Sequence, residues 1–242
     1  MNLPSDFLTI EEMQENNLQK GRIISKTNPK MRPFIGGVKT PFYLFNLEKT
    51  KEYFEKALLF LKTFYQERKK ILVVETRPPF QELVKDFAQR LSLPYINFRF
   101  LGGTFTNFEV IKQRVEFFKK MEEEKNSQVW NKYTKKERAL LEKKLEKLRK
   151  KFEGLKNLDS LPDVLFVLNT EKDILAIQEA RRKKIKIVAV CDTNADPSLV
   201  DYPIPCSNNS LLALKYLLNK VQSFLKPEEE IKKDREKNDR EN

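Results

Sequence analysis

Residues 98–108 read FRFLGGTFTNF and contain the side chains of this sequence best suited to hold an anion. A basic side chain lies between two aromatic rings, and a Gly-Gly pair precedes two hydroxyls and an amide. Glycine lets the backbone turn sharply and approach a neighbour closely. Thr and Asn favour helix caps, and the first amide groups of a helix attract phosphate. The segment therefore predicts a strand-to-helix turn that binds phosphate, and a capped turn without a ligand is the alternative.

Within this segment we expect phosphate contacts from Arg99, Gly102, Gly103, Thr104, Thr106 and Asn107. The Arg99 guanidinium can bind a phosphate through two hydrogen bonds, and the amides that follow Gly103 add donors. Phe100 packs either inward or against a neighbour, and inward packing is the commoner outcome for an aromatic side chain.

Residues 20–39 form a second candidate contact with phosphate. They contain six basic residues and no acid, and Pro29, Pro33, Gly36 and Gly37 interrupt regular structure. This composition predicts an extended basic loop that faces phosphate, with a solvated loop as the alternative. The expected contact residues are Lys20, Arg22, Lys26, Lys30 and Arg32.

Residues 192–197 (DTNADP) follow an apolar run and are the segment that most resembles an enzyme active site. Ligands in open α/β sheets bind at the carboxyl ends of strands, so Asp192 and Asp196 could hold Mg²⁺ or accept a phosphoryl group. No general base, third acid or phosphate-binding glycine loop accompanies them. We therefore favour a local turn in which Asp192 and Asn194 cap backbone amides. A metal- or phosphate-dependent α/β enzyme is the alternative.

The composition favours a polyanionic partner over catalysis. Lys and Arg number 47 against 35 acids, which gives a net charge of +12, and charged residues reach 34%. Such a balance indicates nucleic acid first and an anionic membrane second. Histidine is absent, which removes the commonest general base and most transition-metal sites. We expect no catalytic residue, no metal and no cofactor.

The two cysteines, Cys191 and Cys206, cannot complete a zinc site and are expected to be small core residues. Two free thiols fit a reducing cytosol. The first residues do not resemble a targeting peptide, and no apolar run approaches the roughly 18 residues that span a bilayer.

Strands and helices are expected to alternate along most of the chain. Apolar runs predict strands at residues 41–46, 71–74, 95–98, 163–168, 185–190 and 203–205. Helical periodicity predicts helices at about 47–68, 76–91, 171–184 and 208–224, with Asn46 capping the first. This alternation predicts an α/β fold with a parallel sheet and helices on both faces.

Residues 108–156 interrupt this alternation. Apolar residues recur three and four positions apart on two consecutive helices, at Phe108, Ile111, Val115 and Phe118 and at Leu141, Leu145, Leu148, Phe152 and Leu155. Thr134 and Glu137 match a capping box at the start of the second helix. The pattern predicts an antiparallel coiled-coil hairpin. Residues 112–156 contain 16 basic and 8 acidic residues, which favours contact with RNA or protein over a solvated face.

The chain is expected to divide into four parts. Residues 1–16 are an N-terminal arm or a short helix, 17–107 and 157–225 form one discontinuous α/β domain, 108–156 are the inserted hairpin, and 226–242 are a disordered charged tail. If the basic loop and the hairpin hold one polyanion, a continuous positive surface should link them.

Five motifs follow one another in the order found in a known family. They are residues 28–35 (NPKMRPFI), 98–108 (FRFLGGTFTNF), 161–167 (LPDVLFV), 188–197 (VAVCDTNADP) and 200–205 (VDYPIP). With the charged hairpin between the second and third motifs, the chain resembles the bacterial and organellar family of small-ribosomal-subunit protein two from about Gly21 to Phe224. It departs from that family in lacking histidines ahead of the Asn-Pro-Lys motif, and in carrying Phe100, Ala195 and Cys206 where Trp, Cys and Gly are common.

The resemblance implies a flavodoxin-like parallel sheet with an inserted coiled-coil hairpin and no enzymatic activity. It implies a place in the small ribosomal subunit, bound to its ribosomal RNA mainly through phosphates, and a role in docking ribosomal protein one. It also implies neighbouring small-subunit proteins as partners, and no membrane or small-molecule substrate. The expected location is the ribosome of the cytoplasm, or of an organellar matrix for an organellar gene.

Overall fold

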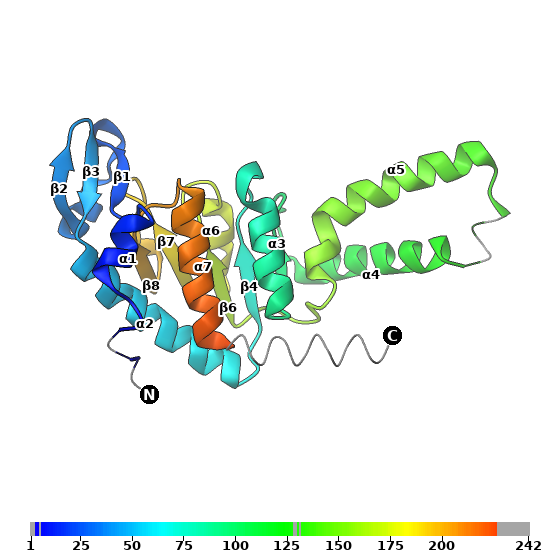
Figure 1. Ribbon diagram of the computed structural model, residues 1–242. Coiled ribbons are helices and arrows are strands. Elements are labelled where there is room, and N and C mark those ends of the chain that lie inside the picture. The colour runs from blue at the N-terminus through cyan, green and yellow to red at the C-terminus, as the bar shows by residue number, and fades with distance from the viewer. Residues whose placement is uncertain (1–2, 5, 128–129, 131, 227–242) are drawn as a thin grey trace.

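The computed structural model describes residues 3–4, 6–127, 130 and 132–226. Five strands form its central sheet in the order β5-β4-β6-β7-β8 (Figure 1). Their bounds are β4 Ile71–Val74, β5 Tyr95–Ile96, β6 Val164–Val167, β7 Lys186–Cys191 and β8 Tyr202–Pro205. Each neighbouring pair is parallel, and Val74, for example, lies beside Val167. The predicted parallel sheet is confirmed.

Helices cover both faces of this sheet. The elements are α2 (Leu47–Gln66), α3 (Gln81–Arg90) and α7 (Leu211–Leu225) on one face, and α6 (Ile174–Arg182) on the other (Figure 1). Alternate strand residues serve the two faces, since Ile71 and Val73 belong to one buried cluster and Leu72 and Val74 to the other. Strands that are apolar on both faces need cover on both, which is why their sequence is a continuous apolar run.

Helix boundaries differ from the predictions by a few residues. The predicted helix 76–91 begins as a 3-10 turn, Pro78–Phe80, before α3, and α6 begins at Ile174 rather than near residue 171. A 3-10 turn, Pro197–Leu199, also precedes β8. Asn46 caps α2 as predicted, because its side-chain oxygen accepts a hydrogen bond from the Lys49 N–H.

A separate antiparallel sheet, in the order β1-β3-β2, precedes the α/β alternation. Its elements are β1 Lys20–Ile23, β2 Ile35–Lys39 and β3 Phe42–Phe45, with 3-10 turns Ile24–Lys26 and Pro29–Phe34 between β1 and β2. Two predictions are therefore wrong: residues 41–46 do not join the parallel sheet, and residues 20–39 are not an extended loop. The reason is that β3 lies between β1 and β2 and pairs with both, while Pro29 and Pro33 fall within a 3-10 turn.

The N-terminal residues pack on the domain. Helix α1 (Ile10–Glu15) is capped by Thr9, which confirms the short-helix alternative. Leu8 and Met13 are fully buried in the cluster that contains α2 and α7. The predicted disordered tail lies outside the described residues, except for Lys226.

The insertion consists of two antiparallel helices that project from the domain (Figure 1). They are α4 (Phe108–Lys125) and α5 (Lys135–Phe152), followed by a 3-10 turn, Glu153–Leu155. The predicted seam is buried or half-buried along both helices, and Phe118 and Phe152 are at most 2% exposed. Glu122 on α4 forms ion pairs with Arg149 and Lys156, and the capping box of Thr134 and Glu137 is present. The remaining domain boundaries are our proposal.

Candidate nucleic-acid interface

The Gly-Gly turn binds an anion that belongs to the chain itself. The carboxylate of Glu179, on α6, accepts hydrogen bonds from the backbone N–H groups of Gly103 (2.6 Å), Phe105 (2.9 Å) and Thr106 (3.2 Å). The Thr106 hydroxyl lies 3.3 Å from the same carboxylate. Glu179 is only 4% exposed, so these donors replace the water that a buried carboxylate would lose.

This arrangement corrects part of the phosphate-site prediction. Asn107 precedes α4 but makes no side-chain cap bond. Thr104 is buried, and its hydroxyl donates to the Leu101 carbonyl at 2.6 Å. Gly103 has a φ of +90°, which favours glycine, so its conformation and its amide both serve the turn. The amides expected to bind phosphate are thus occupied, because Glu179 supplies the anion from within.

The outer part of the same segment stays accessible. Arg99 is exposed, and no ion pair with it is found among the described residues; Gly102, Thr106 and Asn107 are also exposed. Phe100 is buried at 7% exposure and its ring lies 5.3 Å from that of Phe105, so the inward alternative is confirmed. Arg99 is therefore the side chain of this segment best placed to contact phosphate.

The cations of residues 20–39 are divided between internal and external positions. Lys20, Lys26 and Arg32 are exposed, and the Lys20 ammonium lies 5.1 Å from the ring centroid of Phe42. Lys30 instead donates to the Asp196 carboxylate at 2.6 Å and to the Ser198 hydroxyl at 2.9 Å. A hollow of about 550 Å³ lies among Lys20, Lys26, Phe42 and residues just before α7.

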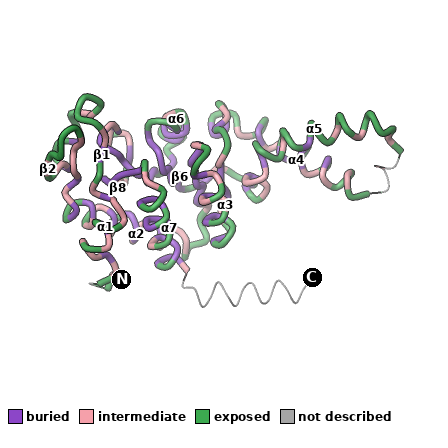
Figure 2. The backbone as a smooth tube through the Cα atoms, turned by 45° about the horizontal axis from the view of Figure 1, so that its top comes forward, coloured by how far each residue is buried: buried purple, intermediate pink, exposed green. Residues whose placement is uncertain are grey.

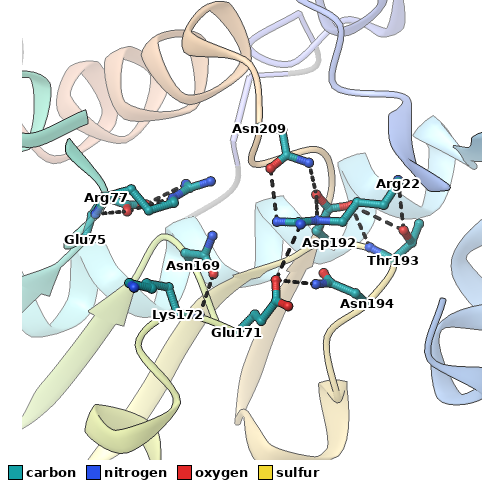
Figure 3. Close-up of polar contacts among 10 residues, drawn as sticks. All are labelled: Arg22, Glu75, Arg77, Asn169, Glu171, Lys172, Asp192, Thr193, Asn194 and Asn209. Atoms are coloured by element: carbon teal, nitrogen blue, oxygen red, sulfur yellow. Dashed lines mark hydrogen bonds and ion pairs between the residues drawn. The ribbon is translucent and has the colours of Figure 1, made fainter. Parts of the chain in front are cut away.

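Arg22 is the internal member of this group and closes a polar cluster at the carboxyl edge of the sheet (Figure 3). Its Nε lies 3.3 Å from Asp192 Oδ2, and its Nη atoms lie 3.0 Å from Asn209 Oδ1 and 3.4 Å from Glu171 Oε2. Gly21 makes the approach possible, because a Cβ there would overlap the Thr193 side chain. The guanidinium is thus the counter-charge of a carboxylate with no exposed surface.

Both aspartates considered as enzyme residues are occupied by contacts within the chain. Burial raises the pKa of Asp192, although the Thr193 N–H and Arg22 act against it. For Asp196, hydrogen bonds from Lys30 and Ser198 outweigh desolvation and lower the pKa. The predicted local turn is found only in part, since Asp192 accepts the Thr193 N–H, whereas the Asn194 side chain instead donates to Glu171. The Asp196 side chain accepts the Ser198 N–H. Among the described residues, no three His, Cys, Asp or Glu side chains gather to hold a metal.

The cysteines are core residues, as predicted. Cys191 and Cys206 are free and fully buried, and burial, with a smaller effect of Asp192, raises the pKa of both thiols. In the described part of the chain, no helix has the length and apolar character needed to cross a membrane.

A buried carboxyl group beside β4 gives the first testable prediction. Burial raises the pKa of Asp173 from 3.8 to about 6, and hydrogen bonds from Thr76 oppose this only in part. Because the folded-state pKa is the higher one, the stabilising effect of the proton is complete below pH 3.8 and is lost as the pH rises through about 6. The loss amounts to roughly 3 kcal/mol.

We therefore expect wild type to lose stability relative to Asp173→Asn as the pH rises from about 3.8 to about 6. Urea unfolding of both proteins across that range measures the difference in their free energies of unfolding. The titration of the other carboxyl groups is common to both proteins and cancels in this difference. Parallel pH profiles would contradict the prediction.

The hairpin carries a stripe of lysines opposite its buried seam. Lys136, Lys143, Lys147 and Lys150 are spaced seven, four and three residues apart and share one face of α5. All four are exposed, and none forms an ion pair with a described residue. Figure 2 shows that α5 is mostly exposed. Two of the three acids of α5 serve elsewhere, since Glu137 bonds Thr134 and Glu142 pairs with Lys125. The third, Glu146, is exposed beside Lys147 and forms no ion pair among the described residues.

The expected continuous surface between the early basic residues and the hairpin is not found. The three-stranded sheet and the hairpin lie at opposite ends of the molecule (Figures 1 and 2). The parallel sheet, which consists of β4 to β8, lies between them (Figure 1). The cations of these two regions therefore form separate clusters at the two ends.

Sequence reasoning missed the role of Glu179 and of Glu171. One signal was present: Glu179 lies three residues after the apolar Ala176, which places both on one face of the predicted helix, and an acid on an apolar face requires a buried partner. Glu171 carried no such signal, because it lies in a turn at the surface.

Comparison with known proteins identifies relatives along nearly the whole described chain. The family model described as ribosomal protein S2 matches residues 13–226. A small ribosomal subunit protein uS2 of Coprothermobacter proteolyticus is 37% identical over 214 residues, which cover 88% of this chain and 80% of the relative. The uS2 proteins of Endomicrobium trichonymphae (38% identical, 86% and 85% covered) and Helicobacter hepaticus (34%, 90% and 83%) are similar matches.

Proposed function

Because the chain belongs to the ribosomal protein S2 family, we propose that its exposed cations bind the phosphate backbone of small-subunit ribosomal RNA. As a member of that family it is a structural constituent of the small ribosomal subunit and not an enzyme. Its place in the cell is the ribosome. Contact with ribosomal RNA through particular residues is the part that we propose.

The lysine stripe of α5 carries this proposal. From Lys136 to Lys150 it extends about 21 Å along the helix, at a rise of roughly 1.5 Å per residue. No acid faces it in an ion pair within the described chain, so its charge is available to an external polyanion. Lysine is a point charge without base-reading geometry, which suits recognition of RNA shape and backbone.

The exposed residues at the other end extend the proposed contact. They are Lys20, Lys26 and Arg32, and Arg99 adds an exposed cation on the hairpin side, beside the Gly-Gly turn that leads into α4. Arg22, Lys30, Gly103 and Thr104 are left out because their polar groups are used within the chain. Gly102, Thr106 and Asn107 can approach RNA only as neighbours of Arg99.

Replacing the four stripe lysines by Gln should weaken binding to a transcript of small-subunit ribosomal RNA. Each lost phosphate contact lowers the slope of log K against log salt by about 0.7–0.9, so the slope should fall by about 3 and low-salt affinity by roughly 100-fold. Filter binding over a salt series measures both. The Lys→Arg variant at the same four positions keeps the charge and should bind as wild type does. Equal slopes in the Gln variant and wild type would contradict the proposal.

We further propose that the chain helps to dock ribosomal protein one. Support comes from the family resemblance, and the hollow beside Lys20 and Phe42 combines cations with apolar surface at the end remote from the hairpin. The test measures binding of purified ribosomal protein one to the full wild-type chain and to the Ile23→Asp variant, which places a charge in the lining of this hollow. Binding that is absent in wild type would reject it.

A further inference from the structure

The amino edge of the parallel sheet carries a row of cations that the surface proposed above does not include. All five strands begin at this edge, so the turns that enter β4 and β7 lie there. Only β6 separates β4 from β7, which places the two turns about 10 Å apart. The cations are Arg68, Lys69 and Lys70 before β4, and Arg181, Arg182, Lys183 and Lys184 before β7.

Acids of the described residues leave these charges without ion pairs. Within the described residues none of the seven side chains forms an ion pair, and all are exposed except the half-buried Lys70. The nearby Asp163 carboxylate accepts the backbone N–H of Lys70 (2.9 Å), and Asp201 pairs with Lys186. Glu67 is the single acid within the first turn. An excess of positive charge therefore remains at this edge.

Two of the cations occupy backbone positions that favour glycine. Arg68 has a φ of 54° and Lys184 a φ of 56°, and each lies just past the end of a helix. A residue with a Cβ is strained in this left-handed conformation, and glycine is the usual choice after a helix. A cation also interacts favourably with a helix C-terminus, which is the purely structural explanation. The two explanations differ in what replacement by glycine would do.

A hollow of about 600 Å³ adjoins the first turn. Its cations are Lys62, Arg68, Lys69 and Lys70, its apolar lining includes Pro94 and Phe224, and no acid lines it. The ends of α2 and α7 meet here, at the lower edge of the molecule in Figure 1. Lysine is depleted at the cores of protein interfaces, whereas phosphate backbones bind lysine and arginine. RNA therefore fits this surface better than a protein partner does.

We propose that the amino edge is a second RNA-binding surface, which holds the phosphates of an RNA segment other than the one at the hairpin. The hairpin projects away from the domain, so one chain would connect two segments of ribosomal RNA (Figure 1). This inference rests on the proposed function, namely that the chain binds ribosomal RNA.

The experiment replaces Arg68 and Lys184 by Gly in the full chain and measures binding to a small-subunit ribosomal RNA transcript across a salt series. Two lost phosphate contacts should lower the slope of log K against log salt by about 1.4–1.8 and weaken low-salt binding roughly tenfold. The melting temperature should stay equal or rise, because glycine removes the strain at both positions. Ser92→Gly is the matched control, since Ser92 has a φ of 54° at the same edge and carries no charge.

A second variant, Lys69→Gln with Arg182→Gln, leaves the strained positions untouched and should lower the slope by the same amount. Both double variants could keep the wild-type slope while the Gln variant of the four α5 lysines shows a lower slope. In that case the amino edge does not bind RNA and the proposed function stands. A lower melting temperature with an unchanged slope would assign the cations to helix stabilisation and overturn the inference. Absence of salt-dependent binding in wild type would instead reject the proposed function itself.

Discussion

Glu179→Ala is expected to destabilise the protein by about 2–4 kcal/mol, because it leaves several amide groups of the Gly-Gly turn without an acceptor. The Phe105 N–H is buried, and those of Gly103 and Thr106 are partly buried, so water can replace the carboxylate only in part. For a chain of this size the melting temperature should fall by roughly 10 °C. Chemical unfolding with a two-state fit measures the change in free energy.

Hydrogen exchange locates the effect of Glu179→Ala. The amides of Gly103, Phe105 and Thr106 should lose protection, while those of β6 and β7 change only through global stability. Glu179→Gln keeps one acceptor oxygen and should lie between wild type and the Ala variant. Gln178→Ala is the control for the helix, since Gln178 is exposed on the same element. Unchanged protection in the turn would contradict the anchoring role of Glu179.

The loss should also reach the proposed RNA contact. Arg99 lies four residues before Gly103, and α4 begins five residues after it. A turn without its anchor would allow both to move. Weaker RNA binding in Glu179→Ala, at a temperature where the variant is fully folded, would therefore reflect lost positioning.

Arg22→Met is expected to cost about 3 kcal/mol, since removal of one partner from a buried ion pair leaves the other charge without compensation. Asp192 has no exposed surface, and the Arg22 side chain is only 22% exposed. Asn209 and Glu171 also lose their bonds to the guanidinium. Lys26→Met removes an exposed cation from the same segment and should leave stability nearly unchanged.

A double-mutant cycle with Asp192→Asn tests the origin of the Arg22 effect. If the unpaired carboxylate causes the loss, Arg22→Met should cost much less in the Asp192→Asn background than in wild type. The pH dependence gives a second check. Burial already raises the pKa of Asp192, and loss of Arg22 removes an interaction that lowers it.

With a raised folded-state pKa, protonation of Asp192 favours the folded variant at low pH and this benefit disappears as the pH rises. The deficit of Arg22→Met should therefore be larger at neutral than at acidic pH. A deficit that is independent of pH and unaffected by Asp192→Asn would show that Arg22 acts through packing alone.

Much of the architecture could be predicted from local patterns. The apolar runs at β4, β6 and β7 predicted strands covered on both faces, and the two seams at three- and four-residue spacing predicted α4 and α5. Asn46 and the Thr134–Glu137 capping box were found at their predicted helix starts. These features depend on interactions between residues that are close in the sequence, so they can be predicted from local patterns.

The partners of the charged side chains could not be predicted in the same way. Residues 20–39 were read as a uniform basic loop, yet Arg22 and Lys30 bind carboxylates and Lys20 and Lys26 do not. Their different positions follow from the pairing of β1 with β3, which places Arg22 against the end of β7. A count of charges contains no information about that pairing.

The sequence by itself thus determined the α/β class, the inserted helical pair, the excess of positive charge and the kinship recognised from ordered motifs. Only the tertiary structure decided which anion the Gly-Gly turn holds and which cations remain available. The physical reason is distance along the chain. Glu179 and Gly103 are 76 residues apart, and Arg22 and Asp192 are 170 residues apart, so only the packed tertiary structure brings either pair together.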